Sequence, residues 1–375
     1  MLARLFVLCT ESIGREEQNM SKIPITVCII AKNEEKHIEE CLKHLKKYDL
    51  EVIVTDTGST DRTKEIAEKY ADKVVDFPWI DDFAAARNFC ASHASNNWII
   101  AIDCDEYVNS IDVRILRILM QRYPRHTGVL RIKNLVPGND GSTGYVTDDV
   151  PRMYNKNFYQ FTFPIHEQIY SKDPKKADDN IEAFLLPMEV VHHGYIVTGD
   201  DMKRKQERNL NLLQESIKND PTNGYYYFQV GQSNFVLGNI DIALEFYEKA
   251  LSLVQSTENL YVPELIMSLS KAYRAKGRVK DAVAILDQYK DTFNTAKFYY
   301  TYATMLREDQ QILKALAVYI KVTLMSDVET LGASLTSCYA YIINIYESMG
   351  NKEMAELFHK QFLECLEERE RVVNS

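Results

Sequence analysis

The first hundred residues alternate between two hydrophobic patterns. Short runs of consecutive apolar residues are typical of buried strands, and segments with an apolar residue every three or four positions are typical of helices. The first pattern predicts strands at residues 25–31, 51–56, 73–77 and 98–103. The second predicts helices at residues 33–48, 62–71 and 82–94. This alternation indicates a parallel sheet with helices on both faces, which binds ligands at the carboxyl ends of its strands.

Residues 108–199 follow a less regular pattern. The stretch "VPGNDGSTGY", residues 136–145, is rich in glycine and polar turn residues and favours a loop. The stretch "YQFTFPIHEQIY", residues 159–170, alternates apolar and polar positions like a strand, with an interruption at Pro164. We assign both stretches to the same domain as the strands that precede them.

From about residue 200 the chain becomes helical and repetitive. Residues 227–251 match the tetratricopeptide spacing, in which small residues lie where two helices touch and large residues fill the space between them. The pattern recurs less perfectly in three further units. Four alanines mark the units at intervals of 33 to 40 residues, near the ~34-residue period of such repeats: Ala243, Ala282, Ala315 and Ala355. An irregular helical bundle is the alternative.

These patterns divide the chain into four parts. We expect an N-terminal arm at residues 1–22, an α/β domain at 23–199, a connecting helix at 200–220 and a repeat domain at 221–375. Met20 is an alternative to Met1 as the start of translation, because the first predicted strand begins soon after it. The apolar run at residues 5–9 is much shorter than the ~20 residues of a membrane helix, so no membrane-spanning segment is expected.

Composition narrows the class of protein. The 375 residues carry a formal net charge of −10, which argues against a nucleic-acid partner and against an anionic membrane surface. The seven cysteines contain no C-x-x-C pair, and their number is odd. We therefore expect reduced thiols in a cytoplasmic protein, with no disulfide framework and no zinc site.

The strand "WIIAID" ends in a cluster of carboxylates. Asp103, Asp105 and Glu106 lie within four positions, where they repel one another and are costly to desolvate. A divalent cation such as Mg²⁺ or Mn²⁺ prefers carboxylate ligands and would offset this repulsion. A solvated acidic turn is the alternative, since D-x-D alone is a weak signal.

The span from Ile25 to Tyr195 resembles glycosyltransferase family two, which has the GT-A fold. The resemblance is carried by several stretches in order: "VCIIAKNEEKHIEECLKHL", "EVIVTDTGSTDRT", "DFAAARNFC", "IIAIDCDEYV" and "PIHEQI". It implies an α/β GT-A nucleotide-sugar-binding domain, followed here by an all-α tetratricopeptide-like superhelix. The implied reaction is the inverting transfer of a sugar from a nucleotide diphosphate, with UDP as the expected nucleotide. The combined layout resembles the sublancin-type peptide S-glycosyltransferases.

The resemblance also implies roles for residues at the strand ends. Asp105 would bind the metal ion, and Asp103 would reach the ribose or a metal-bound water. Asp56 would accept a hydrogen bond from the nucleotide base. Asn33 and Glu34 would lie near the nucleoside, although Asn33 could instead cap the following helix.

Further charged residues are candidates for binding the donor. Arg87 would pair with a phosphate or brace the acidic loop, with a surface salt bridge as the alternative. Arg152 is a candidate contact of the diphosphate. Glu106 would line the pocket for the donor sugar or face solvent. Cys104 is expected to be a small buried residue and not a nucleophile.

Two candidates complete the expected site. Glu167, in "PIHEQI", is the candidate general base that deprotonates the acceptor. His193, in "VVHHGY", is the candidate third metal ligand, preferred to His192 because it adjoins Gly194, where backbone can approach a ligand closely. His192 is expected to face away from His193 if the segment is a strand. A buried core histidine is the alternative.

The acceptor stays open at this point. A peptide cysteine or serine side chain, a cell-surface glycan and a lipid-linked saccharide all fit, and a non-catalytic scaffold is the rival from another class. The repeats are expected to bind the acceptor or to form a homodimer. That expectation rests on the aromatic stretches "YYYF" and "FYYTY", which contain more rings than one buried helical stripe accommodates.

Overall fold

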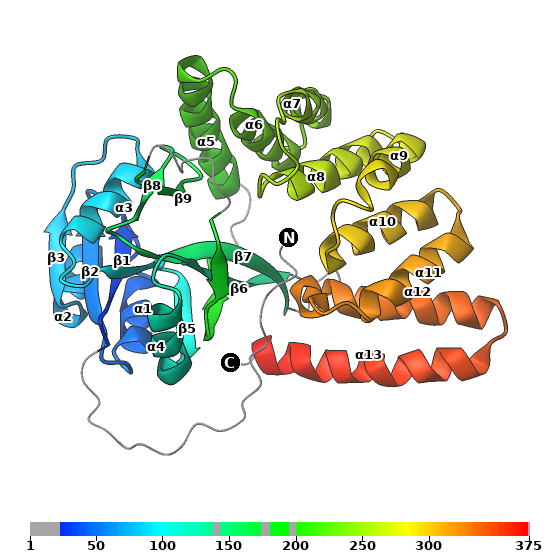
Figure 1. The fold of residues 1–375 in the computed structure, drawn as a ribbon, viewed down its shortest axis with the longest axis horizontal. Helices are drawn as coiled ribbons and strands as arrows, with labels where there is room; N and C mark the ends of the chain where they lie inside the picture. Colours follow the sequence, from blue (N-terminus) through cyan, green and yellow to red (C-terminus); the bar gives the residue numbers. More distant parts are fainter. Residues whose placement is uncertain (1–22, 138–142, 174–180, 195–199, 374–375) are drawn as a thin grey trace. The chain divides into compact units, whose positions relative to one another are not determined.

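The computed structural model describes residues 23–137, 143–173, 181–194 and 200–373 (Figure 1). The chain divides into two compact units. The first comprises the described residues up to Ile132 together with Asp148–Gly194, and the second comprises those of Lys133–Thr147 together with the described residues that follow Tyr195. No helix among the residues that the structure describes is long and apolar enough to cross a membrane.

A mixed sheet organises the first unit. Its strand order is β3-β2-β1-β4-β7-β6-β11-β5, and β10 pairs with β6. The four predicted strands run parallel to one another: β1 (Ile25–Ala31), β2 (Glu51–Asp56), β3 (Lys73–Asp76) and β4 (Trp98–Ala101). Strand β7 (Thr143–Asn155) pairs antiparallel with β4, so the sheet is parallel only in its first half.

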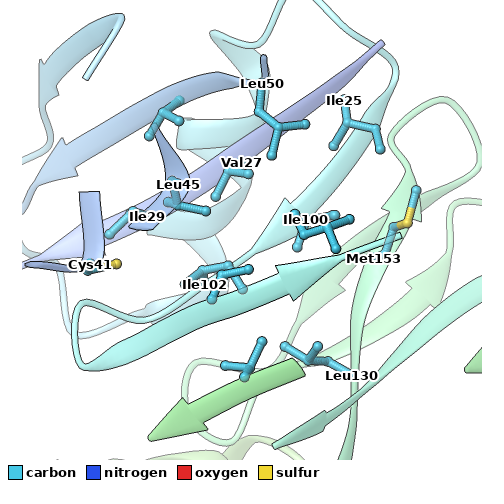
Figure 2. Packing of buried hydrophobic residues seen from close by; sticks show 14 of the residues in the cluster. Ile25, Val27, Ile29, Cys41, Leu45, Leu50, Ile100, Ile102, Leu130 and Met153 are labelled. Atoms are coloured by element: carbon cyan, nitrogen blue, oxygen red, sulfur yellow. The ribbon is translucent and has the colours of Figure 1, made fainter. Parts of the chain in front are cut away.

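Helices cover both faces of the parallel half, as the alternation predicts. The helices are α1 (Ile38–Leu45), α2 (Thr63–Tyr70), α3 (Phe83–Ser92) and α4 (Val113–Arg122). Helix α1 buries its predicted stripe Ile38, Cys41, Leu42 and Leu45 in the same core as Val27 and other alternate residues of β1 (Figure 2). Residues of opposite parity, such as Cys28, pack in a separate core with Cys90 of α3.

Short strands complete the first unit. They are β5 (Glu106–Ile111), β6 (Thr127–Pro137), β8 (Tyr159–Thr162), β9 (Gln168–Ser171), β10 (Ala183–Leu185) and β11 (Met188–His192). Strands β8 and β9 form a separate antiparallel pair interrupted at Pro164, as predicted. The predicted loop 136–145 is partly wrong, because both of its ends belong to β6 and β7; residues 138–142 lie outside the described residues.

The second unit consists mainly of consecutive helices. They are α5 (Asp200–Asn219), α6 (Gly224–Val236), α7 (Ile240–Ser252), α8 (Val262–Ala275), α9 (Val279–Tyr289), α10 (Ala296–Glu308), α11 (Ile312–Thr323), the short 3-10 helix η2 (Val328–Leu331), α12 (Ser334–Ser348) and α13 (Lys352–Val373). The four marker alanines are buried on the second helix of each pair, namely α7, α9, α11 and α13. The tetratricopeptide-like architecture is therefore confirmed.

The aromatic stretches of the repeats are mostly core. Six of their rings are buried: Tyr225, Tyr226, Phe228, Phe298, Tyr299 and Tyr302. The expectation of a surplus of exposed rings is wrong, because neighbouring helices enclose each helix on more than one stripe. The aromatic residues therefore do not mark a binding face.

Part of the β6–β7 ribbon belongs to the helical unit. Thr147 donates its hydroxyl to the carbonyl of Thr330, and the backbone N–H of Ala333 donates to the carbonyl of Tyr145 at 2.7 Å. The Lys297 ammonium donates to the carbonyl of Thr147. A truncation after Asp220 would remove all three partners, so it does not separate one intact unit from the other.

Gly231 provides a test of the repeat packing. A Cβ at this position of α6 would lie 2.5 Å from the ring of Tyr247, which is fully buried on α7. We expect Gly231→Ala to lower the free energy of unfolding by about 1–3 kcal/mol, because the overpacked helices must separate. Urea denaturation measures the change, with Val236→Ala at an exposed position of α6 as the control. An unchanged stability would show that this contact is looser than described.

Candidate functional site

The ends of three neighbouring strands bring the candidate residues to one edge of the sheet. Ala31 of β1 and Asp56 of β2 are paired in register, and Cys28 of β1 is paired with Ala101 of β4. The residues that follow β1 and β4 therefore emerge beside Asp56. This is the edge at which α/β sheets bind ligands.

Asn33 joins the turn after β1 to the turn after β2. Its side-chain oxygen accepts from the backbone N–H of Thr60 at 2.8 Å, and its own N–H donates to the Ser59 hydroxyl at 3.0 Å. The next residue, Glu34, donates its N–H to the Thr63 hydroxyl at 2.6 Å. The helix-cap alternative for Asn33 is wrong, since α1 begins after His37 and has no side-chain cap.

Asp56 is buried and turned towards its own turn. Its carboxylate accepts from the N–H of Gly58 at 3.2 Å and of Ser59 at 3.1 Å. Gly58 has a φ of +100°, a conformation that favours glycine. Backbone N–H groups of the turn thus orient the Asp56 carboxylate.

The D-x-D segment is a tight turn between β4 and β5. The N–H of Glu106 donates to the carbonyl of Asp103 at 3.1 Å, and the Glu106 carboxylate accepts from the N–H of Asp103 at 2.8 Å. The thiol of Cys104 is buried against the carbonyl of Ile30 at 3.6 Å, which confirms its prediction as a small buried residue. The turn therefore projects Asp103 and Asp105 while burying the residue between them.

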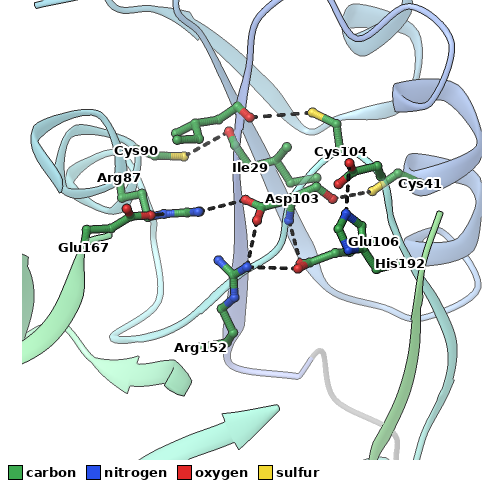
Figure 3. A network of polar contacts seen from close by, with 12 residues as sticks. Ile29, Cys41, Arg87, Cys90, Asp103, Cys104, Glu106, Arg152, Glu167 and His192 are labelled. Atoms are coloured by element: carbon green, nitrogen blue, oxygen red, sulfur yellow. Dashed lines mark hydrogen bonds and ion pairs between the residues drawn. The ribbon is translucent and has the colours of Figure 1, made fainter. Parts of the chain in front are cut away.

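Two arginines donate hydrogen bonds to the carboxylate of Asp103 (Figure 3). Arg87 Nη2 donates to Oδ1 at 2.8 Å, and Arg152 Nη2 donates to Oδ2 at 2.7 Å. Burial acts to raise the pKa of Asp103, but the charges of Arg152 and Arg87 outweigh it and hold the pKa well below its usual range. Asp103 is therefore ionised at neutral pH, and both of its oxygens already have cationic partners.

Glu106 and Arg152 form the next link of this network. Arg152 Nη2 donates to Glu106 Oε1 at 2.9 Å. Glu106 is 3% exposed, and burial raises the pKa of its carboxyl. Neither expected role of Glu106, in the sugar pocket or facing solvent, is correct, because the turn itself encloses it. The structure places Arg152 against these two acids, as a brace of the turn.

Arg87 also binds the candidate base. Its Nε donates to Glu167 Oε1 at 2.5 Å, and the Glu167 side chain is 13% exposed. Arg87 lies on α3 and Glu167 follows β8, so the contact is between distant segments of the chain. The alternative of a surface salt bridge is wrong, since Arg87 is itself buried. Of the two predicted roles, the structure shows the bracing of the acidic loop.

His192, and not His193, faces the D-x-D turn. His192 Nε2 lies 3.1 Å from Asp105 Oδ2, whereas the ring of His193 stacks on Tyr107 with centroids 4.4 Å apart. The choice of His193 is therefore corrected. The two rings therefore have different partners, and His193 lies just beyond the end of β11. His192 is paired with Glu106, next to Asp105, and this pairing between distant segments cannot be read from alternation in the sequence.

Gly194 allows the Asp105 carboxylate to lie close to the backbone that follows His193. A Cβ at Gly194 would lie 1.7 Å from Asp105 Oδ2, so any side chain there would displace the carboxylate. The sequence pointed to this glycine as a place of close backbone approach. The group that approaches is Asp105, a residue that sequence reasoning did not connect with it.

The residues at Asp105 fit a divalent cation only in part. Asp105 Oδ2 and His192 Nε2 are 3.1 Å apart, close to the separation of about 3 Å between adjacent octahedral ligands that each lie about 2.1 Å from Mg²⁺. Asp103 does not fit, because both of its oxygens accept from arginines. Among the residues that the structure describes, no cluster of three or more His, Cys, Asp or Glu could hold a metal ion, so further ligands would have to come from the bound donor or water.

Comparison with known proteins identifies relatives of this chain. Residues 26–170 match the model of glycosyl transferase family 2. The chain is 29% identical over 252 residues to the SPbeta prophage-derived glycosyltransferase SunS of Bacillus subtilis, covering 66% of this chain and 57% of SunS. It is 25% identical over 272 residues to a TPR repeat-containing protein of Synechococcus elongatus, covering 71% of this chain and 65% of that protein.

Solved structures with low similarity to this chain include two repeat proteins. The crystal structure of MamA aligns with 47% of this chain and 99% of its own at 21% identity, with a TM-score of 0.38. YrrB, described as a TPR protein with an unusual peptide-binding site, aligns with 44% of this chain and 80% of its own at 16% identity, with a TM-score of 0.35.

The fold and the acidic strand-end site define a glycosyltransferase domain. Residues 26–170 form a glycosyltransferase family 2 domain, and tetratricopeptide-like helical repeats follow it. The chain spans about three fifths of the length of the curated relatives that it matches over both halves.

The Asp105–His192 pair predicts a pH dependence of stability. Burial acts to lower the pKa of His192, but the hydrogen bond and charge of Asp105 outweigh it and raise the pKa above its ordinary value. The stabilisation is therefore present at low pH and is lost as the pH rises through the raised pKa. Asp105→Asn should lower the pKa of His192 and remove this dependence, which amounts to at most about 1 kcal/mol. NMR titration of the histidine rings measures the pKa, urea denaturation at several pH values measures the stability, and Asp76→Asn at an exposed strand end is the control.

Proposed function

We propose that this protein transfers a sugar, with inversion, from a nucleoside diphosphate sugar to a nucleophilic side chain or hydroxyl. UDP is the proposed nucleotide. The observation that carries the proposal is the grouping of Asp105 with His192 and of Glu167 with Arg87 around the same D-x-D turn, at the ligand-binding edge of a family 2 domain. A non-catalytic scaffold has no need of such a buried and costly set of charges.

The nucleoside is proposed to bind over the ends of β1 and β2. Asp56 would accept from the base, and Asn33 and Glu34 would lie beside the ribose. Their turns are already joined by hydrogen bonds, so this half of the site requires little ordering when the donor binds.

A divalent cation, Mn²⁺ or Mg²⁺, is proposed to bind at Asp105 and His192. When bound, it would neutralise the diphosphate of the donor and stabilise it as a leaving group. Asp103 is not part of this proposal as a ligand. Asp103 instead accepts hydrogen bonds from Arg87 and Arg152 and so holds these two side chains at the edge of the site.

Glu167 is proposed to act as the general base. The acceptor O–H or S–H would give its proton to Glu167 as the acceptor atom forms a bond to the anomeric carbon. The bond from that carbon to the diphosphate oxygen breaks in the same step, and the electron pair leaves with the nucleoside diphosphate. Because Arg87 binds Oε1, we assign the proton to Oε2.

The proposed acceptor is a cysteine or serine side chain of a peptide. The similarity to SunS and the layout of a family 2 domain with helical repeats support this choice. A cell-surface glycan or a lipid-linked saccharide is the alternative. The repeats are proposed to bind the acceptor or a second copy of the chain, since stacked helix pairs form extended surfaces suited to protein segments.

A screen of UDP- and GDP-sugars for donor hydrolysis tests the proposed reaction and its metal ion. We expect hydrolysis of one or a few donors, and its loss in excess EDTA. Asp105→Ala should reduce the rate by several orders of magnitude while the fold stays intact, because it removes a proposed ligand. Asp76→Ala, which removes an exposed aspartate at the end of β3, is the matched control. Full activity in EDTA would exclude the metal ion, and hydrolysis of no donor would count against the proposed function.

Glu167→Gln tests the base. The substitution keeps the shape of the side chain and its contact with Arg87 but removes basicity. On a hydroxyl acceptor, turnover should fall by about 10²–10⁴ while nucleotide affinity hardly changes. On a thiol acceptor the loss should be smaller, since a cysteine of pKa near about 8.5 is partly thiolate at neutral pH. Wild-type turnover on a serine peptide would reject Glu167 as the base.

A further inference from the structure

Arg87 is the one described side chain that hydrogen-bonds both Glu167 and the D-x-D turn. It is 6% exposed, and its Nε and Nη2 bind Glu167 and Asp103 at 2.5 and 2.8 Å. A guanidinium is planar and rigid, so two partners on different nitrogens are held at a defined separation and angle. The centroid of the Phe161 ring lies 5.5 Å from the guanidinium carbon of Arg87, so the ring supports one face of the guanidinium.

The segment that carries Glu167 depends on α3 for its conformation. Phe163 and His166 have φ values of +74° and +52°, which are unfavourable for residues other than glycine and persist only when the surroundings hold them. Helix α3 supplies such support. The N–H of Phe83 donates to the carbonyl of Pro164 at 2.8 Å, and the Asn88 amide bonds both backbone groups of Phe161 at 2.8 and 3.0 Å.

The charge pattern makes Arg87 a fixed cation. Burial acts to lower the pKa of Arg87, but Asp103 and Glu167 outweigh it, so the group stays charged at any working pH. Charged partners alternate along the network from Glu167 through Arg87, Asp103 and Arg152 to Glu106. Removing Arg87 would leave Glu167 without its cation and Asp103 with Arg152 alone, so Glu167 would no longer be tied to the turn.

We propose that Arg87 is a positioning residue that fixes Glu167 relative to the donor-binding turn, so that the acceptor is deprotonated only at the place where the donor sugar is held. This inference rests on the proposed role of Glu167 as the base. It assigns to Arg87 no contact with the donor. The loss of Arg87 therefore affects turnover more than donor affinity, because a displacement of about 1 Å in a reacting group costs on the order of 10²-fold in rate.

The test compares Arg87→Met, Arg87→Lys, Glu167→Gln and the double variant R87M/E167Q in hydrolysis of the donor that the screen identifies. Arg131→Met is the matched control, since Arg131 pairs with Asp149 between β6 and β7. For R87M we expect kcat to fall by about 10²-fold and KM for the donor to change less than about threefold. R87K keeps the charge but not the planar guanidinium that binds two partners at once, so its kcat should also stay low. The double variant should be no slower than E167Q alone.

Each other outcome has a distinct meaning. Wild-type kcat in R87M, equal losses in kcat and donor affinity, or additive losses in the double variant would overturn the positioning role. If R87M does not fold, R87K and R87K/E167Q carry the same comparison. If E167Q retains full turnover while Asp105→Ala abolishes it, the base assignment fails and the inference fails with it, but the transferase proposal stands. Hydrolysis of no donor would instead count against the proposed function itself.

Discussion

The carboxylate of Asp103 is the contact on which the rest of the site depends. It lies at the end of a strand buried on both faces, and each of its oxygens accepts from a different buried arginine. An isolated carboxylate in that position would be costly to desolvate, and an isolated guanidinium beside it equally so. The two arginines come from α3 and β7, so this one ion triad fastens a helix and a distant strand to the D-x-D turn.

The triad also distinguishes the environments of the two aspartates, Asp103 and Asp105. Because Asp103 is fully engaged with protein cations, Asp105 is the residue of the pair that faces His192 and can bind a ligand. Gly194 keeps that side of the turn open by leaving no atom where a Cβ would meet the carboxylate. One D-x-D sequence thus provides an acid that braces the turn and an acid that we propose as a ligand, separated by a buried cysteine.

Local patterns in the sequence predict most of the fold but only part of the site. The stripe on α1 and the marker alanines of the repeats follow from spacing alone, since each reports on packing within a few turns of helix. The partners of Arg87 and Arg152 lie 16 to 80 positions away, and no periodicity encodes such pairs. The contact of His192 with Asp105 depends on the pairing of His192 with Glu106 across two strands, which alternation does not reveal. Burial of the repeat tyrosines was missed because it depends on how adjacent helices enclose one another.

The assignment of Lys133–Thr147 to the helical unit has a consequence for synthesis on the ribosome. Thr147 and its partners Lys297 and Thr330 are 150 and 183 positions apart. The ribbon therefore emerges long before the helices that hold it, and at typical elongation rates of about 5–20 residues per second the delay is on the order of ten seconds or more. During this interval the strands of β6 and β7 present unsatisfied backbone groups at their outer part. The ribbon thus acquires these partners only after the helices up to the start of α12 have been synthesised, and not when the α/β portion alone is complete.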